Sequence, residues 1–114
     1  MGISKEEIHH ISMVNKIKKN PLILNLEDII LSTGETIIFR KDGLNIQREP
    51  DGMMFDPTTH ILYNIEYKTR HSQNSYQKAK TQLKTSGEKL QSIFRDWEVK
   101  NLYVSGNNFD VREI

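Results

Sequence analysis

Acidic and basic side chains flank a predicted turn in the middle of the 114-residue chain. The turn is Asp56-Pro57-Thr58-Thr59-His60, with a strand predicted on each side of it. The midpoint of this turn sets the register of an antiparallel pair, in which Asp51 faces Glu66 and Glu49 faces Lys68. Directly opposed residues share one face of a sheet, so these four side chains are predicted to converge.

A cluster of this composition can hold a divalent metal ion. Three close carboxylates repel one another unless a cation or a proton neutralises part of their negative charge. Oxygen ligands with several waters suit Mg²⁺, and Mn²⁺ accepts the same site. We therefore predict Asp51, Glu66 and the backbone carbonyl of Tyr67 as metal ligands. Lys68 is placed to hold or deprotonate an attacking water, or to stabilise charge on a phosphate.

The same residues also permit a purely structural interpretation. Glu49 and Lys68 would then form a cross-strand ion pair on a solvated sheet face, which is a common and weak interaction. The adjacent histidines His9 and His10 are a further candidate for metal binding. Their side chains point about 100° apart on a helix, so both cannot easily face one ion, and we interpret them as surface residues.

Helices at both ends of the chain are predicted to frame this cluster. The first spans residues 4–19, with Ser4 as N-cap and Glu7 in the capping-box position. Ile3, Ile11, Val14 and Ile17 form an apolar stripe that contains Glu7, so Glu7 either closes the cap or joins a site. A second amphipathic helix begins near Asn74 and runs to about residue 97. Gly87 lies on its apolar stripe and either permits close packing against the sheet or breaks the helix.

Strands are predicted to fill the rest of the chain. After a possible short helix near residues 26–31, three strands are predicted to form an antiparallel meander with a turn at Asp42-Gly43. They span residues 36–40, 44–55 and 61–69, and the second is interrupted at Pro50 and Gly52. Side chains along 61–69 alternate, with Ile61, Tyr63, Ile65 and Tyr67 on one face and Leu62, Asn64, Glu66 and Lys68 on the other. A strand at 99–105 and a short edge strand at 109–113 complete a single domain covering residues 1–114.

Composition narrows the classes of function. The chain has no cysteine, which excludes disulfides, zinc–thiolate sites and cysteine nucleophiles. We find no signal-like apolar segment, no phosphate-cradling glycine loop and no nucleophile elbow, so we expect a cytoplasmic protein that binds neither a membrane nor a nucleotide cofactor. The net charge is only +1. Residues 68–89 are nevertheless strongly basic, which indicates either a polyanion partner or a solvated helix face.

The segment EPDGMMFDPTTHILYNIEYKT resembles the PD-(D/E)XK nuclease superfamily. Pro50-Asp51 matches the PD half of the motif, and Glu66-Tyr67-Lys68 matches the ExK half. The resemblance covers most of the chain, because the predicted element order is similar to the family's α-β-β-β-α-β core, an α/β (α+β) fold with a mixed central sheet flanked by helices. It implies Mg²⁺-dependent hydrolysis of phosphodiester bonds, with Mn²⁺ as a substitute.

The resemblance also implies further site residues and partners. A glutamate on the first helix often joins the metal site, which points to Glu7, with Glu6 and Glu49 as substitutes. A Gln or Lys on the helix after ExK often contacts substrate, which points to Gln77 and Lys80. Small members include Holliday junction resolvases, which act as homodimers, and phage- or virus-encoded nucleases found in a host-cell cytoplasm. We therefore expect a homodimer that binds nucleic acid, with DNA favoured over RNA.

The remaining predicted contacts with nucleic acid are basic residues near the motif. Arg70 and His71 lie in the polar loop after Lys68, and Lys84 follows Lys80 by one helical turn. Nearly all of the chain is used by the core, so a structure-selective or non-specific endonuclease is expected rather than a base-specific one. Two alternatives remain: a non-catalytic nucleic-acid-binding or protein-interaction module on the same fold, and an RNA-cleaving nuclease toxin.

Overall fold

The computed structural model describes residues 4–24, 26, 31–33, 39–40, 47–48 and 51–114. Helix α1 (Lys5–Lys19) begins at the predicted N-cap, where the backbone N–H of Glu7 donates to the Ser4 hydroxyl at 3.1 Å. It ends at Asn20, and a short 3-10 helix η1 (Pro21–Leu24) follows because proline cannot continue the α-helical hydrogen bonding. The predicted bounds of the first helix are confirmed.

A five-stranded mixed sheet forms the centre of the molecule, in the order β1-β4-β5-β6-β7. Strands β4 and β5 are antiparallel, β5 and β6 are parallel, and β6 and β7 are antiparallel. The parallel pair is joined by the long helix α2, as a crossover connection requires. The strands are β1 (Leu31–Thr33), β4 (Gly52–Asp56), β5 (Ile61–Lys68), β6 (Glu98–Ser105) and β7 (Asp110–Glu113).

The predicted meander is confirmed in its two antiparallel pairings but wrong as one continuous sheet. The second predicted strand is divided into β3 (Gln47–Arg48), which pairs with β2 (Phe39–Arg40) in a separate two-stranded sheet, and β4, which pairs with β5. The other neighbour of β4 is β1, which precedes the predicted first strand in the sequence. The expected turn at Asp42-Gly43 and most of the possible helix at 26–31 lie outside the described residues.

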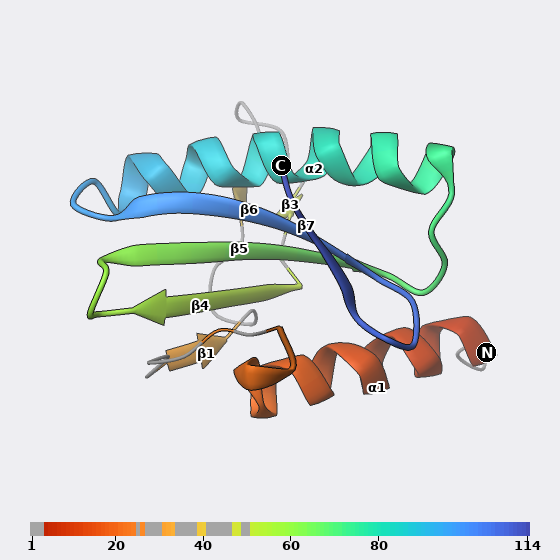
Figure 1. The fold of residues 1–114 in the computed structure, drawn as a ribbon. Helices are drawn as coiled ribbons and strands as arrows, with labels where there is room; N and C mark the ends of the chain where they lie inside the picture. Colours follow the sequence, from red (N-terminus) through yellow and green to blue (C-terminus); the bar gives the residue numbers. More distant parts are fainter. Residues whose placement is uncertain (1–3, 25, 27–30, 34–38, 41–46, 49–50) are drawn as a thin grey trace.

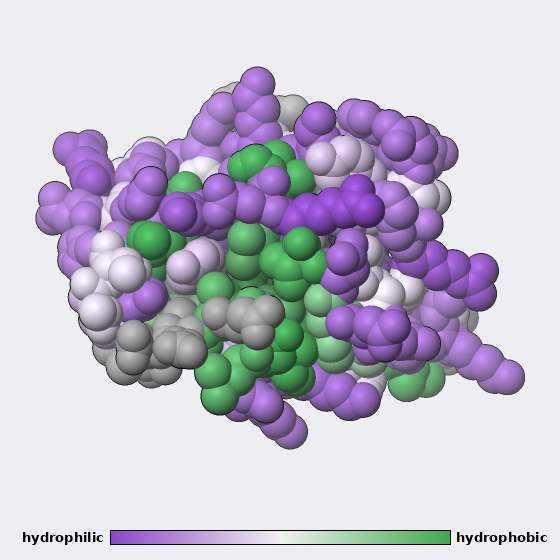
Figure 2. All heavy atoms as spheres, in the orientation of Figure 1, coloured by the Kyte–Doolittle hydropathy of each residue, from purple (hydrophilic) through white to green (hydrophobic). Residues whose placement is uncertain are grey.

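Helix α2 (Gln73–Ile93) is continuous and lies across one face of the sheet, and α1 covers the other (Figure 1). The N-cap of α2 is Ser72, two residues before the predicted start at Asn74, and the Ser72 hydroxyl accepts the N–H of Ser75. Figure 2, in the orientation of Figure 1, shows hydrophilic side chains along α2. Among the described helices, none is long and apolar enough to cross a membrane.

The core has one part on each face of the sheet, as the predicted alternation along β5 requires. On the α1 face, Ile65 and Tyr67 pack with residues of α1, β4 and β6. On the α2 face, Leu62 packs with Leu90 of α2. Asn64 is also buried on the α2 face, where its amide donates to the Ser86 hydroxyl at 2.8 Å. The two faces of β5 therefore anchor the two helices.

The buried stripe of α1 differs from the predicted one. Met13, Val14 and Ile17 are buried, whereas Ile11 is 51% exposed and Glu7 is exposed. At about 100° per residue, the buried stripe is rotated toward Met13, away from the flank that carries Ile11 and Glu7. The expectation that Glu7 lies on the buried face is therefore wrong, and the half-buried residue one turn before Met13 and Val14 is His10.

Gly87 allows α2 to approach β6 closely, which decides between its two predicted roles. A Cβ atom at Gly87 would lie 2.6 Å from Oδ1 of Asn101 and 3.0 Å from its Nδ2. That Oδ1 already accepts a hydrogen bond from the Asn64 amide at 3.1 Å. The Asn101 side chain therefore cannot move away without losing a partly buried hydrogen bond.

Replacing Gly87 by alanine is expected to destabilise the protein. Overpacking costs about 1–3 kcal/mol, and the better helix propensity of alanine offsets at most about 1 kcal/mol. Urea denaturation should show a lower free energy of unfolding for Gly87→Ala, with Thr85→Ala on the exposed face of α2 as the matched control. In an Asn101→Ala background the same change should become neutral or stabilising, and equal costs in both backgrounds would contradict the steric explanation.

Candidate active site

The predicted register across the β4–β5 turn is confirmed. Gly52 pairs with Ile65, and the pairing continues without a bulge to Asp56 and Ile61. Asp51 directly precedes β4, so the same register places it beside Glu66. Met53 and Phe55 pack on the α2 face, which is the face of Glu66 on β5. The Asp51 carboxylate, in contrast, contacts the Tyr67 backbone and His10 of α1. The fourth member of the predicted cluster, Glu49, lies outside the described residues.

Asp51 is held by the backbone of the ExK segment. Its Oδ2 accepts the N–H of Tyr67 at 2.8 Å, and its side chain is only 19% exposed. The same oxygen lies 3.4 Å from Nε2 of His10, which also lies 3.0 Å from the carbonyl oxygen of Tyr67. Three polar atoms from α1, β5 and the start of β4 thus meet at one end of the sheet.

Lys68 and Glu66 lie on the same face of β5 because they are two residues apart. The Lys68 ammonium is 3.5 Å from Oε1 of Glu66, and both side chains are partly buried, at 26% and 14% exposure. This pairing gives the lysine a fixed carboxylate partner beside the Asp51 site. Glu49, the predicted cross-strand partner of Lys68, lies outside the described residues, so that pair stays a prediction.

His10 is the site residue that sequence reasoning missed. The signal was its spacing, since His10 lies three, four and seven residues before the buried Met13, Val14 and Ile17. His9 points elsewhere, with its Nε2 3.0 Å from Oδ1 of Asn107, as the predicted divergence of adjacent helical side chains requires. Among the described contacts, the α1 side chain that reaches Asp51 is His10 and not Glu7.

The surroundings of His10 favour its protonated form. The hydrogen bond to Asp51 is the largest influence and raises its pKa above the ordinary value of 6.5, while partial burial lowers it. The negative charge of Asp51, the hydrogen bond to the Tyr67 carbonyl and the charge of Glu66 raise the pKa further. Together the hydrogen bonds and the negative charges outweigh the lowering of the pKa by burial, so the pKa of His10 is raised.

The oxygen donors at this strand end are of the type that a hydrated divalent ion uses. Among the described side chains, no group of three His, Asp or Glu residues is arranged to hold one metal ion. Magnesium, however, usually keeps several waters and is bound through only one or two carboxylates. Asp51 and the Tyr67 carbonyl, which both lie beside Nε2 of His10, would be donors of that kind, whereas the Glu66 carboxylate is paired with Lys68.

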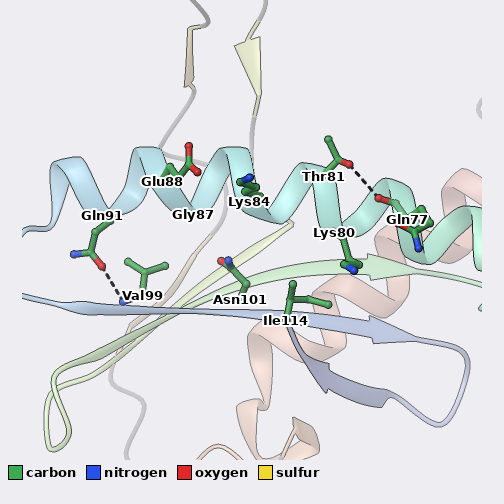
Figure 3. Close-up of a pocket in the computed structure, with 10 residues that line it drawn as sticks. All are labelled: Gln77, Lys80, Thr81, Lys84, Gly87, Glu88, Gln91, Val99, Asn101 and Ile114. Carbon is green, nitrogen blue, oxygen red and sulfur yellow. Dashed lines mark hydrogen bonds between the residues drawn. The ribbon is translucent and has the colours of Figure 1, made fainter.

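Three of the residues predicted to contact nucleic acid line a groove between α2 and β6. The groove has a volume of about 460 Å³, and Figure 3 shows Lys80 extending from α2 toward the strands. Its opposite wall includes Val99 and Asn101 of β6 and the C-terminal Ile114. The wall of the groove that faces α2 belongs to β6, whereas Asp51 and Glu66 lie at β4 and β5. The lining residues from α2 include Gln77, Lys80 and Lys84.

Arg70 and His71 have different surroundings. Arg70 lines a hollow of about 340 Å³ between the N-terminal turn of α1, the end of β5 and the β6–β7 turn. His71 packs edge-on against the rings of Tyr76 and Tyr103, and its Nδ1 lies 3.1 Å from the Tyr103 hydroxyl. These contacts hold the loop before α2 against the sheet. The structure therefore separates the predicted nucleic-acid contacts into three places.

No protein-family model, curated protein or solved structure matches this chain.

Replacing Asp51 by asparagine is expected to lower the pKa of His10 in the metal-free protein, because it removes the main hydrogen bond and the nearest negative charge. The folded-state pKa of His10 is raised, so this contact stabilises the fold fully below pH 6.5 and less as the pH rises through the raised value. NMR titration of the His10 ring measures the pKa directly. Glu98→Gln, at the start of β6, is the control, and an equal pKa in wild type and Asp51→Asn would contradict the assignment.

Proposed function

We propose that this protein is a metal-dependent nuclease that hydrolyses phosphodiester bonds, with DNA as the favoured substrate. The observation that carries the proposal is the contact between Asp51 and the strand of the ExK residues. Asp51 directly precedes β4, which is antiparallel to β5, and its carboxylate accepts the N–H of Tyr67, between Glu66 and Lys68. Polar groups of these types at this spacing supply the ligands and the cation that phosphodiester hydrolysis needs.

The order of the elements supports the same proposal. With the two-residue strands β2 and β3 set aside, the chain runs through α1, β1, β4, β5, α2 and β6. This is the helix–strand–strand–strand–helix–strand order that the PD-(D/E)XK resemblance implies. Asp51 directly precedes β4, and β4 is antiparallel to β5, which carries Glu66, Tyr67 and Lys68.

Each residue would have a distinct role. Asp51, Glu66 and the Tyr67 carbonyl would hold the ion, which when bound supplies Lewis-acid polarisation of the phosphodiester. Lys68, held beside Glu66, would orient the attacking water or stabilise negative charge on the phosphoryl oxygens. Hydrolysis consumes one water, breaks one P–O bond and returns a proton to the leaving oxygen.

Basic residues outside the cluster would attract the polyanion. Lys80 and Lys84 line the α2–β6 groove together with Glu88, and Arg70 lies two residues after Lys68 at the end of β5. Cations at these positions contact phosphates without reading bases, which favours a structure-selective or non-specific enzyme. The homodimer implied by the resemblance belongs to the same proposal, and light scattering of the purified protein tests it.

Cleavage of nucleic acid is expected to require both a divalent ion and the residues of the cluster. Supercoiled plasmid, a four-way DNA junction and tRNA should be incubated with Mg²⁺, Mn²⁺ or EDTA. We expect cleavage of DNA in either metal and none in EDTA. Asp51→Asn and Lys68→Met should each lower the rate at least about a hundredfold, whereas the remote Glu98→Gln should not.

Other outcomes of this assay would replace the proposal. Binding of DNA without cleavage in either metal would favour a non-catalytic binding module. Cleavage of tRNA alone would favour an RNA-specific nuclease. Circular dichroism of each variant must match wild type, because Asp51 also bonds to the backbone of β5.

Removing the two groove lysines is expected to weaken nucleic-acid binding in a salt-dependent manner. Each phosphate contact contributes roughly −0.9 to the slope of log K against log salt concentration. Lys80→Ala/Lys84→Ala should therefore reduce the slope by up to about 2. Fluorescence anisotropy at several salt concentrations measures it, and Lys89→Ala, on α2 but outside the groove, is the matched control. Equal slopes in all three proteins would remove the groove from the binding surface.

A further inference from the structure

We propose that the hollow beside Arg70 binds a phosphoryl group of a nucleic-acid strand, at a place separate from the Asp51 and Lys68 cluster. This inference deepens the proposed function and rests on it for the identity of the ligand. The observation that carries it is a hollow with fixed walls from three elements, in which hydrogen-bond donors predominate. The hollow has a volume of about 340 Å³ and is lined by Lys5, Glu6, His9, Thr69, Arg70 and Asn107.

Hydrogen bonds fix the walls of the hollow to one another. Nε2 of His9 lies 3.0 Å from Oδ1 of Asn107, which joins α1 to the β6–β7 turn (Figure 1). The N–H of Gly106 donates to the carbonyl oxygen of Lys68 at 3.1 Å, and the Tyr67 hydroxyl donates to the carbonyl of Gly106 at 2.9 Å. The turn is therefore held against both α1 and the end of β5. A hollow with fixed walls loses little free energy in ordering them when a ligand binds.

The contact with His9 decides which end of the Asn107 amide can serve a ligand. A carbonyl oxygen can only accept, so Nε2 of His9 donates its hydrogen to Oδ1 of Asn107. The other end of the amide is Nδ2, which can only donate. Asn107 therefore offers the hollow a donor that suits the oxygen atoms of an anion.

The charged residues of the hollow also favour an anion. Its lining contains two cations, the Lys5 ammonium and the Arg70 guanidinium, and one carboxylate, that of Glu6. A guanidinium presents several N–H groups in a plane, a geometry that matches the oxygen atoms of a phosphoryl group. A divalent metal ion is disfavoured, because the hollow would offer it a single carboxylate beside two positive charges.

The hollow lies at the same end of the sheet as the candidate active site. Arg70 lies two residues after Lys68, the last residue of β5. On α1, His9 lines the hollow, and the adjacent His10 contacts Asp51. A strand that is cut at Asp51 and Lys68 would therefore carry other phosphates past the hollow. A phosphate held there would position the strand without reading its bases.

Phosphate binding can be measured without metal or cleavage. Inorganic phosphate should be titrated in EDTA into isotope-labelled protein and followed by NMR of the backbone amides. The key variant is Asn107→Asp, which can still accept from His9 but presents a negative oxygen in place of Nδ2. We expect it to lose at least about tenfold in phosphate affinity. Asn108→Asp is the matched control, because it adds the same charge at the adjacent exposed residue, which does not line the hollow. It should bind phosphate nearly as tightly as wild type.

Variants of the charged residues test the hollow in opposite directions. Lys5→Gln and Arg70→Gln should each weaken phosphate binding by roughly threefold or more, and Glu6→Gln should strengthen it. Lys16→Gln, in the last turn of α1, should have no effect. Equal phosphate affinity in wild type, Asn107→Asp and Arg70→Gln would overturn the inference, because phosphate would then be attracted by surface cations in general.

Binding of oligonucleotides distinguishes the possible sources of the phosphoryl group. Fluorescence anisotropy in EDTA should compare the same oligonucleotide with and without a terminal phosphate. If the hollow holds a phosphodiester within the strand, Asn107→Asp will weaken binding of both equally. If it holds a terminal phosphate, only binding of the phosphorylated oligonucleotide will weaken. Unchanged binding of both would overturn the assignment of the hollow to nucleic acid.

The outcomes separate this inference from the proposed nuclease activity. Oligonucleotide binding that Asn107→Asp weakens, without cleavage in Mg²⁺ or Mn²⁺, would support the hollow and overturn the nuclease proposal. Metal-dependent cleavage with wild-type binding and rate in Asn107→Asp would support the nuclease and overturn the hollow.

Discussion

The hydrogen bonds of the Tyr67 backbone are the interactions on which the rest of the site depends. Its N–H donates to Asp51 and its carbonyl accepts from His10, so both polar groups of one residue are bound by side chains from other elements. A buried backbone group that lacks a partner costs roughly 1–3 kcal/mol, which makes these two side chains part of the fold as well as of the site. The Tyr67 ring is fully buried in the α1 face of the core, and its hydroxyl donates to the carbonyl of Gly106. One residue thus links α1, β4, β5 and the β6–β7 turn.

The two helices are attached to the sheet by different physical means. Helix α1 buries an apolar stripe and adds the polar contact of His10 at the sheet end. Helix α2 buries Ala79, Leu83 and Leu90, and adds a buried amide network centred on Asn64. Polar networks of this kind specify one arrangement, because displacing either strand or helix leaves polar atoms without partners. The close approach at Gly87 then determines how near α2 lies to β6.

Apart from the Lys68–Glu66 pair on β5, the groove lysines lie on a different element from the carboxylates of the candidate site. The carboxylates lie at the ends of β4 and β5, whereas Lys80 and Lys84 line a groove against β6. Around Tyr76 the charges are also positive, with Lys80 and Arg112 each within 6 Å of its ring. This separation explains how a chain with a net charge of only +1 can present a basic surface near an acidic site.

The amino-acid sequence alone predicted the features that depend on neighbouring residues. The cap at Ser4, the turn at Asp56–His60 and the alternation along β5 depend on neighbours a few residues apart, so the register that places Asp51 beside Glu66 followed from local rules. Only the tertiary structure decided the pairing of β1 with β4 and the orientation of α1. Both depend on contacts between distant segments, because the rotation of a helix is set by which side chains the sheet can bury. Burial of Met13 turned His10 toward Tyr67, 57 residues away in the chain, and left Glu7 exposed.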